Sequence, residues 1–195
     1  MQLKKSSKLY IKELKQKRKV NMAKIIAIEG IDRVGKTTLA NMLNKRTNIN
    51  IYKDYSHYNY YDSNLISVVE KTFTFIEVVK QLNLDVICDR FFLTEVVYSK
   101  IVRQRHYVDE YYNIIHNKLL EEEQKGNIET TIIYVQPEDI VLSSLLHGEN
   151  QSEHDKLFRE YCDKLNLKVI TCNWSILDYT VDMIEKMLKV GEKND

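Results

Sequence analysis

Residues 30–37 read G-I-D-R-V-G-K-T and fit the pattern G-x-x-x-x-G-K-[ST] at every fixed position. The two glycines let the backbone turn and approach oxygen atoms closely, so that main-chain N–H groups face a phosphate. Lys36 adds a point charge for the β- and γ-phosphates, Thr37 offers a hydroxyl to Mg²⁺, and Thr38 can donate to an α-phosphate. The segment therefore predicts a site for ATP and Mg²⁺. We expect the ATP contacts to come from Gly30, Ile31, Asp32, Arg33, Val34, Gly35, Lys36, Thr37 and Thr38.

Two further residues with side chains suited to catalysis, Asp89 and Arg90, end the apolar run at 84–90. The carboxyl ends of parallel strands are where α/β proteins bind their ligands. Asp89 can hold Mg²⁺, directly or through water, or take a proton from an acceptor. Arg90 can clamp phosphate and stabilise a transferring phosphoryl group. The alternative is a surface ion pair at a strand end, and the neighbouring phosphate loop favours the catalytic interpretation.

The elements that must position these groups alternate along the chain. Short apolar runs predict strands, and longer segments with apolar residues at helical spacing predict helices. The expected strands are 24–30, 48–54, 84–90, 130–136 and 167–173. The expected helices are 36–46, 64–82, 93–104, 108–125, 138–146, 153–166 and 175–190. This order predicts an α/β fold, the three-layer sandwich of P-loop NTPases, with about five mainly parallel strands and helices on both faces.

Charge divides the 195 residues into two parts. Residues 1–22 hold eight Lys or Arg and one Glu, a net charge of +7, whereas the whole chain carries +1 and residues 23–195 therefore −6. We interpret 1–22 as a basic N-terminal extension and 23–195 as the P-loop kinase domain. The extension either contacts nucleic acid or a membrane or is a solvated tail, and a natural start at Met22 is a third interpretation. The solvated tail and the start at Met22 are favoured over contact with nucleic acid or a membrane.

The composition excludes several classes of protein. No apolar run approaches the ~20 residues of a membrane span and no secretory signal is evident, so we expect a cytoplasmic protein. Neither the three scattered cysteines nor the five histidines have the spacing of metal ligands. A GTPase would carry N-K-x-D after a late strand, but the late strand here ends in TCNWS. A small kinase that phosphorylates a small acceptor remains.

The segment IAIEGIDRVGKTTLANML resembles the start of the thymidylate kinases and the related deoxynucleoside kinases. VICDRF at 86–91, FLTEVVYSK at 92–100 and IIYVQPEDIVL at 132–142 are similar to later parts of that family, so the resemblance spans about residues 23–190. It implies an ATP- and Mg²⁺-dependent kinase with Lys36, Arg33, Asp89 and Arg90 as catalytic residues and Thr37 and Asp89 at the metal. A homodimer is also implied.

Arg33 lies in the middle of the phosphate loop. Many kinases of this group supply arginines to the transferring phosphoryl group from a lid, but the lid candidate here, 142–156, contains no arginine, and Ser143 stands where the family often has one. One style of thymidylate kinase instead places a basic residue in the phosphate loop. We hypothesise that Arg33 takes over the role of the lid arginine. The alternative is an Arg33 side chain that points into solvent.

The acceptor side departs from the family pattern, because YKDYSHYNYYDS replaces its Arg-Glu-Pro-like turn. Candidate acceptor contacts are Asp54, Lys53, Phe75, Arg90, Tyr98 and Arg103. Either Phe73 or Phe75 would stack on a base, and both fit the core equally well. Five tyrosines line the acceptor cleft or form a half-buried loop: Tyr52, Tyr55, Tyr58, Tyr60 and Tyr61.

Three functions remain open. The first is phosphorylation of a deoxynucleoside monophosphate, dTMP or similar, which needs a cation near Arg90 such as Lys53 or Arg103. The second is phosphorylation of a deoxynucleoside, which needs a carboxylate such as Asp54 to deprotonate the 5′-hydroxyl. The third is a non-catalytic nucleotide sensor or nucleic-acid-associated protein, which the missing lid arginines favour. The retained catalytic residues favour an enzyme.

Overall fold

Five parallel strands form one sheet in the order β2-β3-β1-β4-β5. The computed structural model describes residues 22–53, 65–137 and 151–189. The strands are β1 (Ala23–Glu29), β2 (Asn50–Lys53), β3 (Val86–Asp89), β4 (Ile128–Val135) and β5 (Lys168–Cys172). The helices are α2 (Lys36–Thr47), α3 (Leu65–Gln81), α4 (Phe92–Ile101), α5 (Val108–Gln124), α7 (Gln151–Asp163), the short 3₁₀ helix η3 (Trp174–Ile176) and α8 (Leu177–Lys189).

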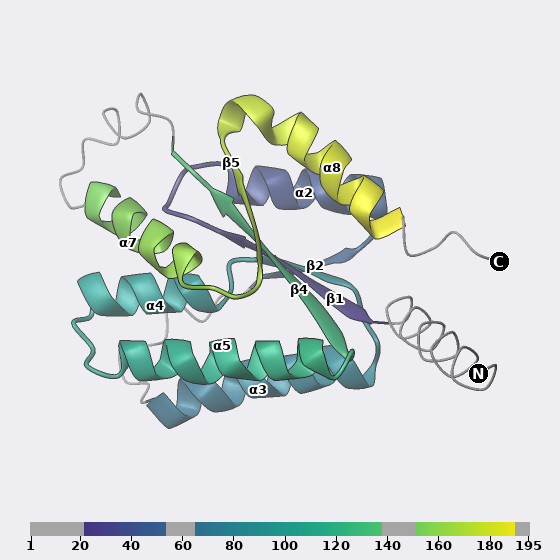
Figure 1. The fold of residues 1–195 in the computed structure, drawn as a ribbon. Helices are drawn as coiled ribbons and strands as arrows, with labels where there is room; N and C mark the ends of the chain where they lie inside the picture. The colour runs from purple at the N-terminus through teal and green to yellow at the C-terminus, as the bar shows by residue number, and fades with distance from the viewer. Residues whose placement is uncertain (1–21, 54–64, 138–150, 190–195) are drawn as a thin grey trace, which may run out of the picture.

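Helices cover both faces of the sheet, as Figure 1 shows. Helices α2 and α8 pack on one face, and α3, α4, α5 and α7 lie on the other. The predicted three-layer α/β sandwich with a five-stranded parallel sheet is thereby confirmed. Doubly covered strands must be apolar on both sides, which explains why β1 and β4 are almost continuous runs of buried residues.

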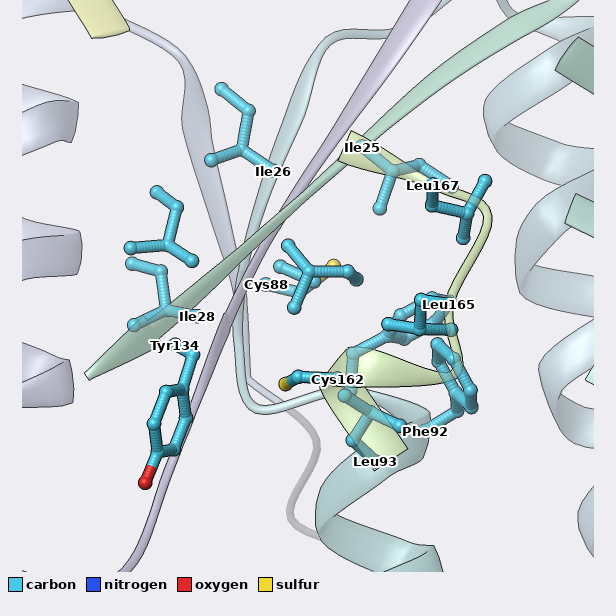
Figure 2. Packing of buried hydrophobic residues seen from close by; sticks show 14 of the residues in the cluster. Ile25, Ile26, Ile28, Cys88, Phe92, Leu93, Tyr134, Cys162, Leu165 and Leu167 are labelled. Carbon is cyan, nitrogen blue, oxygen red and sulfur yellow. The ribbon is translucent and has the colours of Figure 1, made fainter. Parts of the chain in front are cut away.

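The core alternates between the two faces of β1. Ile26 and Ile28 point to one side of the sheet, whereas Ile25 points to the other, toward Leu165 and Phe92 (Figure 2). This alternation follows from the two-residue period of a strand. Each fully buried side chain of this kind contributes roughly 1.5–3 kcal/mol. The burial on both sides holds β1 rigidly at the centre, directly before the phosphate loop.

Within the described residues, the predicted strands and helices lie where the sequence pattern placed them, with shifts at their ends. β2 is shorter than the predicted 48–54, because Asn48 adopts a left-handed conformation that caps α2, its N–H donating to the Asn44 carbonyl at 2.8 Å. The N-terminal extension to residue 21, the predicted helix 138–146 and most of the lid candidate lie outside the described residues. Among the helices that the structure describes, none has the length and apolarity needed to span a membrane.

Candidate active site

The phosphate loop joins the end of β1 to the start of α2, as the sequence predicted. Gly30 has φ +141°, and a Cβ atom at this position would meet the Val135 carbonyl oxygen of β4 at 2.5 Å. Gly35, at φ +91°, turns the chain into α2. The loop therefore lies directly against the carboxyl end of β4, and the N-terminus of α2 presents its free N–H groups to an anion.

Lys36 is buried within the loop, with 5% of its surface exposed. Its ammonium group donates a short hydrogen bond to the Ile31 carbonyl oxygen. Burial, together with the charge of Arg90, lowers the pKa of Lys36 from 10.5 to about 8, although the charges of Asp32, Glu29 and Asp89 act in the opposite direction. A buried ammonium with a single carbonyl acceptor is only partly compensated, so the arrival of phosphate anions would stabilise its charged form.

Thr37 and Asp89 come together across the gap between α2 and β3. The Thr37 hydroxyl donates to an Asp89 carboxylate oxygen at 2.7 Å. Asp89 is 8% exposed and ends the strand that pairs with β1, with Asp89 beside Ile28 in the register. A hydroxyl and a carboxylate side by side form the hard oxygen donor set that Mg²⁺ prefers. These two residues therefore fit the metal site predicted for them.

Arg90 extends toward the phosphate loop. Its guanidinium lies 2.5 Å from a carboxylate oxygen of Asp32, and its backbone N–H donates to the Ile28 carbonyl at 3.1 Å. Arg90 has φ +79°, a left-handed conformation that costs a non-glycine residue roughly 1 kcal/mol. Such strain persists only where the surroundings hold it, and it is typical of functional sites.

Arg33 also has a left-handed backbone, with φ +67°, at the tip of the phosphate loop. Its side chain is exposed to solvent. The loop therefore presents Arg33 outward, which fits both a cation that would contact a bound phosphate and a solvated arginine. Its role stays a prediction.

Glu29 is a site residue that the sequence analysis missed. The side chain is fully buried, and its carboxylate accepts hydrogen bonds from the N–H groups of Phe91, Leu93 and Thr94 and a short one from the Thr94 hydroxyl. Burial raises the pKa of Glu29 from 4.5 to about 7, opposed by the hydrogen bonds from Thr94 and Leu93 and by the charges of Lys36 and Arg90. A carboxylate ending an otherwise apolar strand was the available signal, since a buried charge needs partners.

A pocket of about 600 Å³ opens beside this centre. Its aromatic wall holds Phe75, which stacks on Tyr52 with ring centroids 4.5 Å apart, and Phe91, 5.6 Å from Phe75. The polar lining contains two carboxylates, Glu70 and Glu95. The residues of the pocket are Tyr52, Ser67, Glu70, Lys71, Thr72, Thr74, Phe75, Phe91, Phe92, Glu95 and Tyr111. Aromatic rings with a few polar groups are typical of a small-molecule site.

The structure separates Phe73 from Phe75. Phe75 lines the pocket, whereas the Phe73 ring lies under the Lys118 ammonium at 5.6 Å and packs against the core. Phe75 is thus the phenylalanine that lines the pocket, and its stacking on a base stays a prediction, whereas Phe73 packs against the core.

Arg103 does not line the pocket but binds Glu95, which does. Its guanidinium donates to Glu95 at 2.8 Å and to the Ser99 hydroxyl at 3.1 Å, and Arg105 lies 3.8 Å from the same Glu95 carboxylate. Glu95, which sequence analysis missed, faces the pocket with two arginines behind it. Glu95 is 5% exposed and forms ion pairs with both arginines.

Tyr98 and Lys53 lie at the edges of the site. Tyr98 packs on His154 of α7 with ring centroids 4.9 Å apart, and burial together with the charge of Asp32 raises its pKa. Lys53 is exposed at the end of β2 and pairs in the register with Asp89. Asp54, Ser143 and the tyrosines from Tyr55 to Tyr61 lie outside the described residues.

The fold is shared with nucleotide-bound proteins of known structure. The YorR protein from Bacillus subtilis, in complex with phosphorylated GDP, matches with a TM-score of 0.65 and 19% identity, covering 88% of this chain and 99% of that chain. Deoxyadenosine kinase from M. mycoides matches with a TM-score of 0.51 and 18% identity with products dCMP and a flexible dCDP bound, and with 0.52 and 19% with dCTP bound. Both comparisons cover 85% of this chain and 99% of that chain.

No protein-family model and no curated protein matches the chain. At these identities the structural similarity establishes a common fold. The chain therefore shares the three-layer α/β fold of these proteins, as the sequence resemblance implied.

Proposed function

We propose that the protein is a kinase that transfers the γ-phosphoryl group of Mg-ATP to a nucleotide-type acceptor. The observation that carries the proposal is the adjacency of two sites. Lys36, Thr37, Asp89 and Arg90 form a phosphate and metal centre, and Phe91, the next residue after Arg90, lines the separate pocket. A donor site that shares a wall with an acceptor pocket is the geometry that phosphoryl transfer needs.

Each side chain of the centre has a role in the transfer. The loop N–H groups and Lys36 hold the β- and γ-phosphates, and Thr37 and Asp89 would hold Mg²⁺, which neutralises charge on those phosphates. An acceptor oxygen forms a bond to the γ-phosphorus while the bond to the bridging oxygen breaks, and ADP leaves. A nucleoside acceptor also loses its 5′-hydroxyl proton, for which Asp89 is a candidate base if its carboxylate does not hold the metal directly, whereas a monophosphate dianion has no proton to lose. Arg90 and Arg33 stabilise the charge on the moving group.

A deoxynucleoside monophosphate, dTMP or similar, is our first acceptor. Two lysines support a monophosphate acceptor. Lys71 lines the pocket, and Lys53 lies beside Asp89 on the edge strand β2. Either ammonium would hold a monophosphate close to the γ-phosphoryl group. The Tyr52–Phe75–Phe91 wall offers rings for the base.

A deoxynucleoside is the second candidate acceptor, supported by the charge of the pocket. Glu70 supplies a carboxylate to the lining, whereas the Glu95 carboxylate is held by Arg103 and Arg105. A carboxylate suits a nucleoside, because it can accept the 5′-hydroxyl proton and it repels a phosphate.

A product-resolved assay tests the proposal. Purified protein, Mg-ATP and a panel of deoxynucleosides and their monophosphates are incubated, and products are separated and identified. We expect one class of acceptor to be phosphorylated and the reaction to disappear in Lys36→Ala. Transfer only to nucleosides would select the second candidate. ATP binding without transfer to any acceptor would refute the kinase and favour a nucleotide sensor.

A further inference from the structure

The last residue of β1 is tied to the first turn of α4. Glu29 accepts hydrogen bonds from Phe91 N–H at 3.1 Å, Leu93 N–H at 2.9 Å and Thr94 N–H at 3.2 Å, and a further one from the Thr94 hydroxyl. The first N–H groups of a helix have no partner within the helix, and its positive end favours an anion. Glu29 therefore caps α4 from a different element, with a hydrogen-bond-accepting carboxyl group supplied by the central strand.

The Glu29 carboxylate binds the backbone directly after Arg90. Arg90 precedes Phe91 in the turn from β3 to α4 and is held by its own N–H bond to the Ile28 carbonyl, 3.1 Å away on β1. The left-handed Arg90 backbone, at φ +79°, needs such external support. Two adjacent residues of β1 thus fix the turn on both sides of Arg90.

Glu29 also precedes Gly30, the first residue of the phosphate loop. A single side chain consequently connects the loop that holds ATP with the turn that bears Arg90 and with Phe91 and Phe92, which line the pocket. Displacements of about 1 Å between reacting groups lower rates on the order of 100-fold.

We infer that Glu29 is a positioning residue, which sets the placement of Arg90 and of the acceptor-pocket wall relative to the phosphate loop. This inference rests on the proposed kinase function for its effect on rate. The effect of Glu29 on the turn from β3 to α4 is independent of that function and can be measured separately.

Glu122 provides a matched control for burial. It is 1% exposed, against 0% for Glu29, and accepts from Lys118 at 2.8 Å and from Asn127 at 2.7 Å. Glu122 lies near the end of α5, just before β4 begins, and hence near the amino ends of the central strands, whereas the phosphate loop lies at their carboxyl ends. Loss of either carboxylate destabilises the fold, but only Glu29 adjoins the reacting groups.

The experiment compares Thr94→Val with Thr94→Ser. Valine has the shape of threonine without the hydroxyl donor, whereas serine keeps the hydroxyl, and the Thr94 side chain is otherwise fully buried. We expect kcat to fall about 10-fold or more in Thr94→Val and to stay within about threefold in Thr94→Ser, with the KM for ATP nearly unchanged in both. Glu29→Gln should lower kcat further, and Glu122→Gln should leave kcat unchanged below its unfolding temperature.

Amide hydrogen exchange supplies the readout that needs no activity. In Thr94→Val and Glu29→Gln, the amides of Phe91, Leu93 and Thr94 should exchange about tenfold faster or more, while those of β4 keep their wild-type rates. An unchanged kcat in an active Thr94→Val enzyme, or unchanged exchange at these amides, would overturn the inference. A wild-type protein that binds ATP but transfers nothing would refute the proposed function instead, and amide exchange would still decide whether Glu29 holds the turn.

Discussion

The Thr37 hydroxyl and the Asp89 carboxylate lie 2.7 Å apart, joining the first turn of α2 to the end of β3. Because both oxygens fit Mg²⁺, we expect Thr37→Val and Asp89→Asn to weaken the metal site by about 10- to 100-fold. The measurement is kcat as a function of Mg²⁺ concentration. Thr37→Ser keeps the hydroxyl and should resemble wild type. Identical Mg²⁺ dependence in Thr37→Val and wild type would contradict this role.

Lys36 should take up a proton when ATP binds. Its pKa is lowered to about 8 in the free protein, and the phosphate anions would raise it again. At pH 8 roughly half of the molecules then bind a proton with ATP, and affinity falls as the pH rises above 8. Titration calorimetry in two buffers of different ionisation enthalpy measures the uptake. Equal heats in both buffers at pH 8 would rule the prediction out, and at pH 6.5 the heats should agree.

Arg33→Ala should lower kcat by about 10³-fold or more if Arg33 stabilises the transferring phosphoryl group, as arginines in this role typically do. Arg33→Gly removes the same side chain and adopts φ +67° without strain. An equal loss of kcat in Arg33→Gly and Arg33→Ala would therefore exclude a backbone effect. Steady-state kinetics at saturating ATP provides the test. A kcat within about twofold of wild type would show that the side chain is merely solvated.

Phe75→Ala should raise the KM for the acceptor and leave the KM for ATP unchanged. Stacking of one base on an aromatic ring is worth about 1–3 kcal/mol, so the acceptor KM should rise by about 5- to 150-fold. Phe73→Ala is the matched control, since it removes the same ring from the same helix, outside the pocket. Equal acceptor KM values in the two variants would remove Phe75 from the binding site.

Glu29 should make stability depend on pH between about 4.5 and 7. Its pKa is raised to about 7, so in this range the folded protein keeps a proton that the unfolded chain has lost, and stability falls as the pH rises. The full contribution is present below pH 4.5 and decreases by roughly 3 kcal/mol up to pH 7. The charges facing Glu29 are Lys36 and Arg90, and the Cys162 thiol lies close enough to sense it.

Urea unfolding of wild type and Glu29→Gln at pH 5, 6 and 7 measures this contribution. The difference in unfolding free energy between the two proteins should change with pH, because all other groups cancel. A constant difference over the three pH values would show that Glu29 does not titrate in this range.

The phosphate loop was predictable because its chemistry is local. Gly30, Lys36 and Thr37 act through backbone geometry and spacing within one segment, and the strand–helix alternation predicted the sheet that carries them. Asp89 and Thr37 were both predicted at one metal site, and the structure brings their side-chain oxygens within 2.7 Å of each other.

Residues that act through distant contacts were beyond sequence reasoning. Glu29 and Glu95 bind partners on other turns of the chain, and neither has a spacing that marks it. Phe73 and Phe75 lie two positions apart on one helix, and only the packing of α5 against α3 decides which ring reaches the pocket.

The order β2-β3-β1-β4-β5 has a consequence for how the protein folds during its synthesis. β1 leaves the ribosome first but pairs with β3, about 60 residues later, and with β4, which ends at Val135. Parallel pairings between distant segments form slowly, because the intervening chain must be closed into a loop first. The central strand must therefore wait for more than half of the chain. During that delay its apolar residues lack their partners in the sheet, and a nucleotide that binds the folded protein would stabilise only the finished molecule.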